Sequence, residues 1–105
     1  MTVKIERPEL VRGATIFMSY SVYILECSDK TLYTGFTNNL DRRLWEHNHS
    51  NRGAVYTKYR RPVSIIYSED YETQKEAMRR ERELKTYTRI EKLEVIDQLW
   101  KKMLM

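Results

Sequence analysis

The chain of 105 residues contains a single cysteine, Cys27, only two prolines and only three glycines. One cysteine excludes an internal disulfide and any metal site built from several cysteines, and it fits a reducing compartment. No segment approaches the roughly 18 apolar residues that a membrane-spanning helix requires, and the first residues show no signal-peptide pattern. The sequence therefore predicts a soluble cytoplasmic protein with no membrane partner.

The chain also has little excess of one charge, with 19 Lys and Arg residues against 15 Asp and Glu residues and a net charge of +4. Such a balance favours an anionic partner without requiring one. The length fits one domain with one core. Residues 1–17 contain Pro8 and Gly13, show weak periodicity and precede a strand-like segment that begins near Met18. We therefore expect a flexible N-terminal extension over residues 1–17 and a folded domain over 18–105.

The order of the elements follows from residue type and spacing. Segments 20–27, 31–37 and 63–70 are rich in β-branched and aromatic residues, which predicts strands, and a short turn joins the first two into an antiparallel hairpin. Segments 38–49, 73–85 and 88–104 have helical patterns, and the last two open with capping boxes. Segment 50–62 is predicted to be a loop. The order β-β-α-β-α-α predicts an α+β fold, with a small three-stranded antiparallel sheet flanked by helices.

Two predicted helices carry charged side chains on the face that should be apolar. Two sets share the spacing i, i+3, i+4, i+7: Leu40, Arg43, Leu44 and His47, and Ala77, Arg80, Glu81 and Leu84. A charge directed at the edge of a core loses hydration and needs a partner, a ligand or a water-filled cleft. One interpretation is an ion pair between Arg43 and Glu81, or side chains that bend outward to solvent. The other is a functional site that contains Arg43, His47 and Glu81.

Two of the eight tyrosines differ from the rest, which are interpreted as packing residues. Tyr23 and Tyr33 lie in the middle of the hairpin, and Gly35 interrupts the second strand two residues after Tyr33. A glycine within a strand indicates a bulge or the close approach of another group. A two-residue turn would direct the two tyrosines to opposite faces of the sheet, whereas a register shifted by one residue directs them to the same face.

Four sequence elements taken together resemble the GIY-YIG endonuclease superfamily. They are "VYIL" at 22–25, "YTG" at 33–35, Arg43, and Glu81 within "EAMRRERELK". The resemblance covers about residues 19–92. It is closest to the small single-domain bacterial members and is similar to the nuclease domain of excinuclease C. It implies a GIY-YIG-like fold and a divalent-metal-dependent endonuclease that hydrolyses DNA phosphodiester bonds, on branched or single-stranded DNA in repair.

The resemblance also implies a role for each site residue. The implied catalytic residues are Tyr23, Tyr33, Arg43, His47 and Glu81. Tyr33 is the implied general base, and because a free tyrosine has a pKa of about 10, this role requires nearby positive charge. Arg43 is the implied clamp on the scissile phosphate, and Glu81 is the implied ligand of a single Mg²⁺ or Mn²⁺. Gly35 leaves room at the site, and Lys85, one turn after Glu81, is a supporting residue.

Phe36 departs from the family pattern, because the excision-repair relatives have a lysine directly after the glycine. Another basic residue has to supply that contact. Segment 50–62 interleaves basic and aromatic residues, a combination that suits phosphates and unstacked bases, although a solvated charged loop has the same composition. The candidate nucleic-acid-binding residues are Arg42, Arg52, Lys58, Tyr59, Arg60 and Arg61.

Two alternatives to an enzyme stay open at this point. One is a non-catalytic nucleic-acid-binding module of the same fold, and the other is a domain that is active only with a protein partner. The helix at 88–104 is a candidate surface for such a partner, but its apolar residues suit the core better: Ile90, Leu93, Ile96, Trp100 and Met103. We expect DNA as the partner, with RNA left open, and a monomeric protein.

Overall fold

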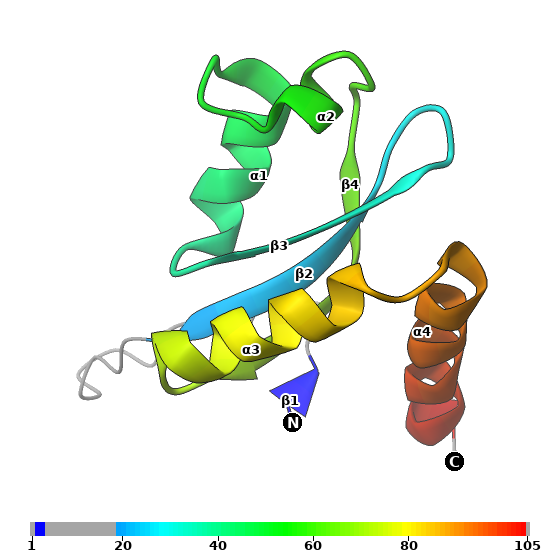
Figure 1. The fold of residues 1–105 in the computed structure, drawn as a ribbon. Coiled ribbons are helices and arrows are strands. Elements are labelled where there is room, and N and C mark those ends of the chain that lie inside the picture. Colours follow the sequence, from blue (N-terminus) through cyan, green and yellow to red (C-terminus); the bar gives the residue numbers. More distant parts are fainter. Residues whose placement is uncertain (1, 4–18, 105) are drawn as a thin grey trace.

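The computed structural model describes residues 2–3 and 19–104 (Figure 1). Its elements are β1 (Thr2–Val3), β2 (Tyr20–Glu26), β3 (Leu32–Thr37), α1 (Leu40–His49), α2 (Val55–Lys58), β4 (Ser64–Tyr71), α3 (Gln74–Lys85) and α4 (Arg89–Leu104). The predicted α+β class, with an antiparallel sheet flanked by helices, is confirmed. Two features differ from the prediction. Helix α2 forms inside the predicted loop, and the two-residue strand β1 adds a fourth strand to the sheet.

All strand pairs are antiparallel, and the strands lie in the order β1-β4-β2-β3. The central strand β2 is buried over residues 21–25, as expected for a strand covered on both faces. At the edge, β1 pairs with β4 through Thr2 opposite Asp70 and Val3 opposite Glu69. The rest of the predicted extension, residues 4–17, lies outside the described residues, so its flexibility stays a prediction.

The turn between β2 and β3 sets the register of the hairpin. It spans three residues, 28–30, and Lys30 has a φ of 70° in the left-handed region. The Lys30 amide donates to the Cys27 carbonyl at 2.9 Å, and the Cys27 amide donates to the Thr31 carbonyl at 2.9 Å. A three-residue turn with a left-handed third residue is a common hairpin connection. It shifts the register by one from the two-residue alternative.

As a result, Tyr23 lies opposite Gly35 and Leu25 lies opposite Tyr33. Because side chains alternate along a strand, Tyr23 and Tyr33 point to the same face of the sheet. This face is packed by α1, with Leu25, Leu40 and Val63 in its core cluster. The register that places both tyrosines together is therefore the one that the chain adopts.

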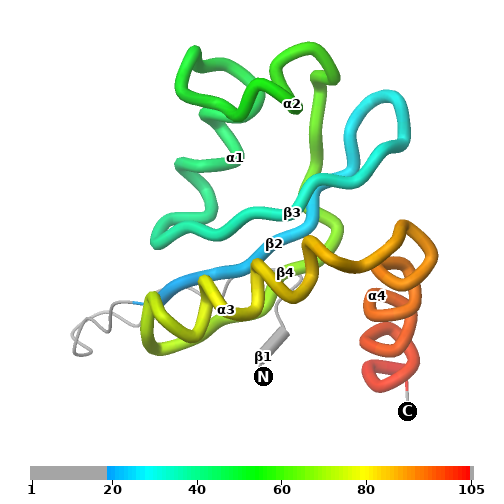
Figure 2. Tube along the Cα trace, in the orientation of Figure 1, coloured from blue at the N-terminus to red at the C-terminus, as the bar shows by residue number. Residues whose placement is uncertain are grey.

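The opposite face of the sheet is packed by α3 and α4. Val22 contacts Ala77 and Leu84 of α3, and a second cluster joins Ile24 to Ile96 of α4. Figures 1 and 2 show α1 and α2 on one side of the sheet and α3 and α4 on the other. The sheet thus separates the helix that carries Arg43 and His47 from the helix that carries Glu81.

Side-chain caps determine where the helices begin. The Asn39 side chain accepts from the Arg42 amide at 3.0 Å and starts α1. The two predicted capping boxes are present, with the Glu76 amide donating to Thr73 Oγ1 and the Glu91 amide to Thr88 Oγ1, each at 3.2 Å. These local bonds satisfy backbone amides in the first turn and fix the residue at which each helix starts.

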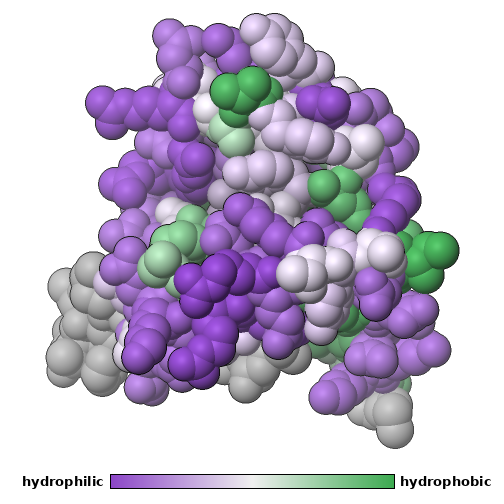
Figure 3. Space-filling model, in the orientation of Figure 1, coloured by the Kyte–Doolittle hydropathy of each residue, from purple (hydrophilic) through white to green (hydrophobic). Residues whose placement is uncertain are grey.

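The expectation that the apolar residues of α4 lie in the core is wrong for most of them. Ile96 is buried, but four others are exposed: Ile90, Leu93, Trp100 and Met103. The face of the molecule in Figure 3 is mostly hydrophilic, with isolated hydrophobic patches. In the described part of the chain no helix has both the length and the apolar character needed to cross a membrane.

Candidate active site

Tyr23 and Gly35 pack against each other across the hairpin. A Cβ atom at Gly35 would lie 2.5 Å from the Tyr23 hydroxyl oxygen and 2.7 Å from its Cζ. The Tyr23 ring therefore crosses β3 directly over Gly35, and any side chain at position 35 would displace it. In the structure, the ring of Tyr23 occupies the space that the missing side chain of Gly35 leaves.

His47 of α1 is fully buried, with 0 % of its surface exposed, and both ring nitrogens have hydroxyl partners. Nε2 lies 2.8 Å from the Tyr23 hydroxyl, and Nδ1 lies 2.9 Å from the Thr57 hydroxyl. Burial, together with the positive charge of Arg43, lowers the pKa of His47 to about 4. His47 is therefore neutral near pH 7.

The Tyr23 hydroxyl is the centre of this arrangement. Burial is the main reason that the pKa of Tyr23 is raised to about 12, and the hydrogen bond from Arg43 opposes the rise without cancelling it. The charges of Tyr33 and Glu81 act in the same direction as burial. The Tyr23 phenol therefore stays protonated at neutral pH, and its electrostatic environment includes Arg43 and Glu81 of the implied catalytic set.

Arg43 is held by groups on both sides of α1. Its Nη1 donates to Glu46 Oε1 at 3.0 Å and to the Arg52 carbonyl at 2.8 Å. Burial alone would lower the pKa of Arg43, but hydrogen bonds to Glu46 and Tyr23 raise it above the ordinary value. The side chain remains 26 % exposed, so a ligand can reach it.

Tyr33 lies between two other rings. Its ring centroid is 5.4 Å from that of His47 in an edge arrangement and 5.8 Å from that of Tyr56 in a stacked one. The Arg60 guanidinium lies 4.0 Å from the centroid of Tyr56. Such contacts restrict the orientation of an aromatic ring. The position of Tyr33 is thus set by its neighbours in α1 and α2.

Glu81 lies on α3 and pairs with Lys85 at 3.3 Å. Arg43 pairs with Glu46, so the interpretation of Arg43 and Glu81 as partners of each other is wrong. Glu81 is 16 % exposed. Within the described residues, no three His, Cys, Asp or Glu side chains gather to hold a metal ion by themselves. A single, partly exposed carboxylate fits a Mg²⁺ site, because this ion is usually bound by one or two carboxylates together with water and substrate phosphates.

A buried polar network attaches α3 to β4. The Glu69 carboxylate, which is 0 % exposed, accepts from the Tyr67 hydroxyl, from the Tyr71 hydroxyl at 2.6 Å and from Arg80 Nε at 3.0 Å. Because a buried carboxylate is costly unless it is paired, this network fixes the rotation of α3. Arg80 directly precedes Glu81, so its anchoring determines the direction in which Glu81 projects.

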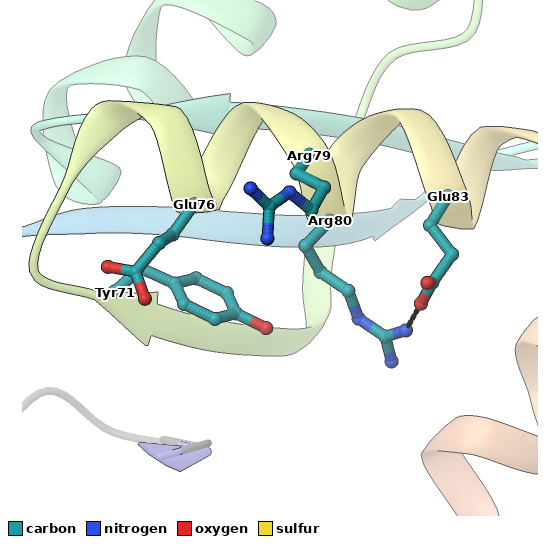
Figure 4. A pocket seen from close by; sticks show the side chains of 5 residues that line it. All are labelled: Tyr71, Glu76, Arg79, Arg80 and Glu83. Atoms are coloured by element: carbon teal, nitrogen blue, oxygen red, sulfur yellow. Dashed lines mark hydrogen bonds and ion pairs between the residues drawn. The ribbon is translucent and has the colours of Figure 1, made fainter.

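A pocket of about 160 Å³ lies beside this network on the outer side of α3 (Figure 4). It is lined by Tyr71, Glu76, Arg79, Arg80 and Glu83. Arg80 pairs with Glu83 at its edge. None of the residues in the implied catalytic set lines this pocket, so the candidate site and the pocket are separate features of the fold.

The six candidate nucleic-acid-binding residues lie in α1, in α2 and in the segments next to them. They differ in exposure and in whether their side chains have partners within the protein. Arg42, Arg52, Lys58 and Tyr59 are exposed. Arg60 pairs with Asp29 at 3.0 Å. Arg61 donates from Nε to the His47 carbonyl at 2.7 Å and from Nη2 to the Ser50 carbonyl at 2.6 Å. Arg61 therefore caps the C-terminal end of α1, where a cation is stabilising.

Sequence reasoning missed the residues that hold the site in place. They are Glu46, Tyr56, Thr57 and Glu69; helical spacing does place Arg80 on the apolar face of α3, but it does not identify Glu69 as its partner. One of them had a readable signal, because Tyr67, Glu69 and Tyr71 alternate along β4 and place an acid on an otherwise apolar strand face. Thr57 and Tyr56 had none, since the segment that contains them shows no periodic pattern.

Comparison with known proteins gives consistent matches over most of the chain. A family model described as "GIY-YIG catalytic domain" matches residues 19–94. UPF0213 proteins of Staphylococcus aureus strains Mu50 and N315 are each 53 % identical over 78 residues, which is 74 % of this chain and 94 % of the relative. The matched region of the family model includes all five residues of the implied catalytic set.

Two solution NMR structures are similar in both sequence and fold. The UPF0213 protein BH0048 from Bacillus halodurans has a TM-score of 0.51 and 40 % identity, with 77 % of this chain and 85 % of that chain covered. The protein EF2693 from E. faecalis has a TM-score of 0.54 and 39 % identity, with 83 % and 88 % covered. The fold is thus shared with these two proteins over most of both chains.

Proposed function

The chain belongs to the GIY-YIG family of nucleases, and we propose that it is a divalent-metal-dependent endonuclease. In this proposal it hydrolyses DNA phosphodiester bonds, on branched or single-stranded DNA in repair. The proposal rests on the family and on the geometry of the site. The observation that carries the proposal is the cluster in which Tyr23 is hydrogen-bonded to His47, under the positive charge of Arg43, with the ring of Tyr33 against His47. A binding module has no need for a buried, charged and fully hydrogen-bonded group of this kind.

Arg43 is the residue that binds the scissile phosphate. Its guanidinium is permanently charged, it is held by Glu46 and the Arg52 carbonyl, and it is exposed enough to reach a ligand. A planar guanidinium can donate two parallel hydrogen bonds to a phosphate. Because the charge is already in place before the reaction, it stabilises the additional negative charge of the transition state with little reorganisation.

Tyr33 is the general base, and Tyr23 has a different role. The Tyr23 hydroxyl is buried, has a pKa of about 12 and already contacts His47 and Arg43. Tyr33 is only partly buried, and its ring is held by His47 and Tyr56. A base must reach the attacking water, so the partly exposed phenol suits this task and the buried one suits the orientation of Arg43 and His47.

Glu81 is the residue that holds a single Mg²⁺ or Mn²⁺, with Lys85 as its supporting neighbour. When bound, such an ion neutralises phosphate charge and activates the leaving oxygen. Glu81 would supply one oxygen ligand, and substrate phosphate and water would supply the others. The ion pair with Lys85 at 3.3 Å orients the Glu81 carboxylate.

The DNA strand approaches along α1 and α2. Lys58, Arg52 and Arg42 are exposed on this side and can neutralise phosphates, while Tyr59, 78 % exposed, offers a ring for an unstacked base. These residues supply the basic contact that the excision-repair relatives make with a lysine at the position of Phe36. Arg60 and Arg61 contribute charge from positions where they also support the fold. Stacking on exposed rings favours single-stranded or branched DNA, because a duplex keeps its bases stacked internally.

The exposed apolar face of α4 supports one alternative, a domain that is active only with a protein partner. Ile90 is 68 % exposed and Trp100 is 45 % exposed, and exposed apolar residues that gather on one helix are typical of interaction sites. In that case the catalytic cluster is still used, but the partner supplies part of the DNA-binding surface. A non-catalytic DNA-binding module is the other alternative.

A panel of DNA substrates distinguishes the three functions. The unaltered chain is incubated with single-stranded, duplex and forked DNA, each with Mg²⁺, with Mn²⁺ or with a chelator, and binding and cleavage are measured separately. We expect metal-dependent cleavage of the single-stranded or forked DNA. Binding without cleavage on every substrate contradicts the enzyme and supports the module, whereas cleavage that appears only after addition of a cell extract supports the partner-dependent domain.

A further inference from the structure

Thr57 of α2 has a hydrogen-bonding arrangement that the proposed reaction does not explain. Its side chain is 0 % exposed, and its hydroxyl oxygen lies 2.9 Å from His47 Nδ1 and 3.0 Å from the Ala54 carbonyl oxygen. We propose that Thr57 is a positioning residue that fixes His47 in the tautomer with its hydrogen on Nδ1, so that Nε2 accepts the Tyr23 hydrogen and the Tyr23 oxygen faces Arg43.

The contact between Thr57 and Ala54 determines where the Thr57 hydrogen lies. Two oxygens 3.0 Å apart repel unless one donates, and a carbonyl oxygen can only accept. The single hydroxyl hydrogen of Thr57 therefore points to the Ala54 carbonyl. The lone pairs of Thr57 Oγ1 then face His47 Nδ1, and only a hydrogen on Nδ1 makes that 2.9 Å contact attractive.

The contacts of Tyr23 lead to the same tautomer from the other side of the ring. Tyr23 is 2 % exposed, and the positive charge of Arg43 acts on its hydroxyl, which favours an orientation with the oxygen lone pairs toward Arg43. The Tyr23 hydrogen then needs an acceptor, and His47 Nε2 lies 2.8 Å away. With the opposite tautomer, Nε2 would donate to the Tyr23 oxygen and the buried Tyr23 hydrogen would lose this acceptor; an unsatisfied buried group of this kind costs about 1–3 kcal/mol.

The result is a directed chain of hydrogen bonds from the site to the backbone of α2. Tyr23 donates to His47, His47 donates to Thr57, and Thr57 donates to the Ala54 carbonyl, with the positive charge of Arg43 acting on the Tyr23 end. Because the hydrogen bond at one ring nitrogen sets the state of the other, Thr57 controls a nitrogen that it does not touch. The short helix α2, in the segment predicted to be a loop, thus orders the candidate site.

The two histidines of the chain allow a direct test by NMR, because His49 is exposed and serves as an internal reference. The ¹⁵N shifts of the ring nitrogens are measured at pH 7 in the full chain and in the variants Thr57→Ser and Thr57→Val. We expect a hydrogen on His47 Nδ1 in the unaltered chain and in Thr57→Ser, and a loss of this preference in Thr57→Val. A hydrogen on Nε2 in the unaltered chain, or an unchanged tautomer in Thr57→Val, overturns the proposal.

A second measurement connects the tautomer to the reaction and rests on the proposed nuclease function. We expect the kcat for DNA cleavage to fall about 10- to 100-fold in Thr57→Val, as for other residues that orient a functional histidine, with KM little changed and with activity restored in Thr57→Ser. A changed tautomer with unchanged kcat contradicts the positioning role. If no substrate is cleaved by the unaltered chain, the nuclease proposal fails while the NMR result still decides the tautomer.

Discussion

Replacing Arg43 with lysine is expected to lower the single-turnover rate of DNA cleavage by about 100- to 1000-fold, the usual effect of removing a preorganised donor from a transition state. Lysine keeps the positive charge, but it cannot donate two parallel hydrogen bonds from a planar group. A guanidinium has five donors and an ammonium group three, so a lysine that kept the contacts with Glu46 and the Arg52 carbonyl would have only one donor left for a phosphate. The measurement is the cleavage rate with enzyme in excess over a DNA substrate that the unaltered chain cleaves.

Arg79→Lys is the matched control for this variant. Arg79 is exposed on α3 and lines the separate pocket, so the same chemical change there leaves the candidate site intact. We expect its cleavage rate to equal that of the unaltered chain. An Arg43→Lys variant that retains its fold and also cleaves at the unaltered rate contradicts the assignment of Arg43 as the phosphate-binding residue.

Tyr33→Phe is expected to lower kcat by about 100- to 10,000-fold, because it removes the proposed general base and leaves the ring. The ring contacts with His47 and Tyr56 do not require the hydroxyl, so the variant is expected to fold as the unaltered chain does. The loss is measured as kcat at saturating metal and DNA, and KM is expected to change little. A variant defective in binding alone would instead raise KM.

Tyr23→Phe provides the comparison that separates the two tyrosines. It removes the partner of His47 Nε2 in a buried position, so we expect the free energy of unfolding to fall by about 1–3 kcal/mol. Its effect on kcat is expected to be smaller than that of Tyr33→Phe, because the Tyr23 phenol stays protonated with a pKa of about 12 and does not act as the base. If Tyr23→Phe abolishes cleavage and Tyr33→Phe does not, the roles of the two residues are reversed.

Most of the elements could be predicted from the sequence because their signals are local, whereas the roles of the site residues are implied by the resemblance to GIY-YIG nucleases. Helical spacing places Arg43 and His47 on one face of α1, and capping boxes at Thr73 and Thr88 mark the starts of α3 and α4. Tyr23 and Gly35 stand out through their places in the hairpin. Each of these features depends on residues fewer than ten positions apart, or on one strand and its neighbour.

The hairpin register could not be settled in the same way. It depends on Lys30, which takes a left-handed conformation that glycine and asparagine favour and lysine does not. A two-residue turn is equally compatible with the sequence. Only the packing of Tyr23 over Gly35 and of Leu25 and Val63 under α1 selects the longer turn.

Sequence patterns could not predict the hydrogen-bond partners of the site residues, because these partners come from other segments of the chain. Thr57 lies ten residues after His47 in a helix of four residues, and Glu69 pairs with Arg80 across the interface between β4 and α3. For α4, apolar residues occur around much of the helix. Spacing alone therefore does not distinguish Ile96, which packs on the sheet, from Trp100, which is exposed.

The central claim is that this cluster hydrolyses phosphodiester bonds with a metal held by Glu81, and a comparison of the unaltered chain with Glu81→Gln tests it most directly. Glutamine keeps the size of the side chain but removes the charge that binds the cation. Single-stranded and forked DNA are incubated with each protein over a range of Mn²⁺ and Mg²⁺ concentrations, and cleaved products are quantified. The account predicts metal-dependent cleavage by the unaltered chain and a loss of at least about 100-fold in Glu81→Gln. Equal cleavage by both proteins, or none by the unaltered chain at any metal concentration, would contradict it.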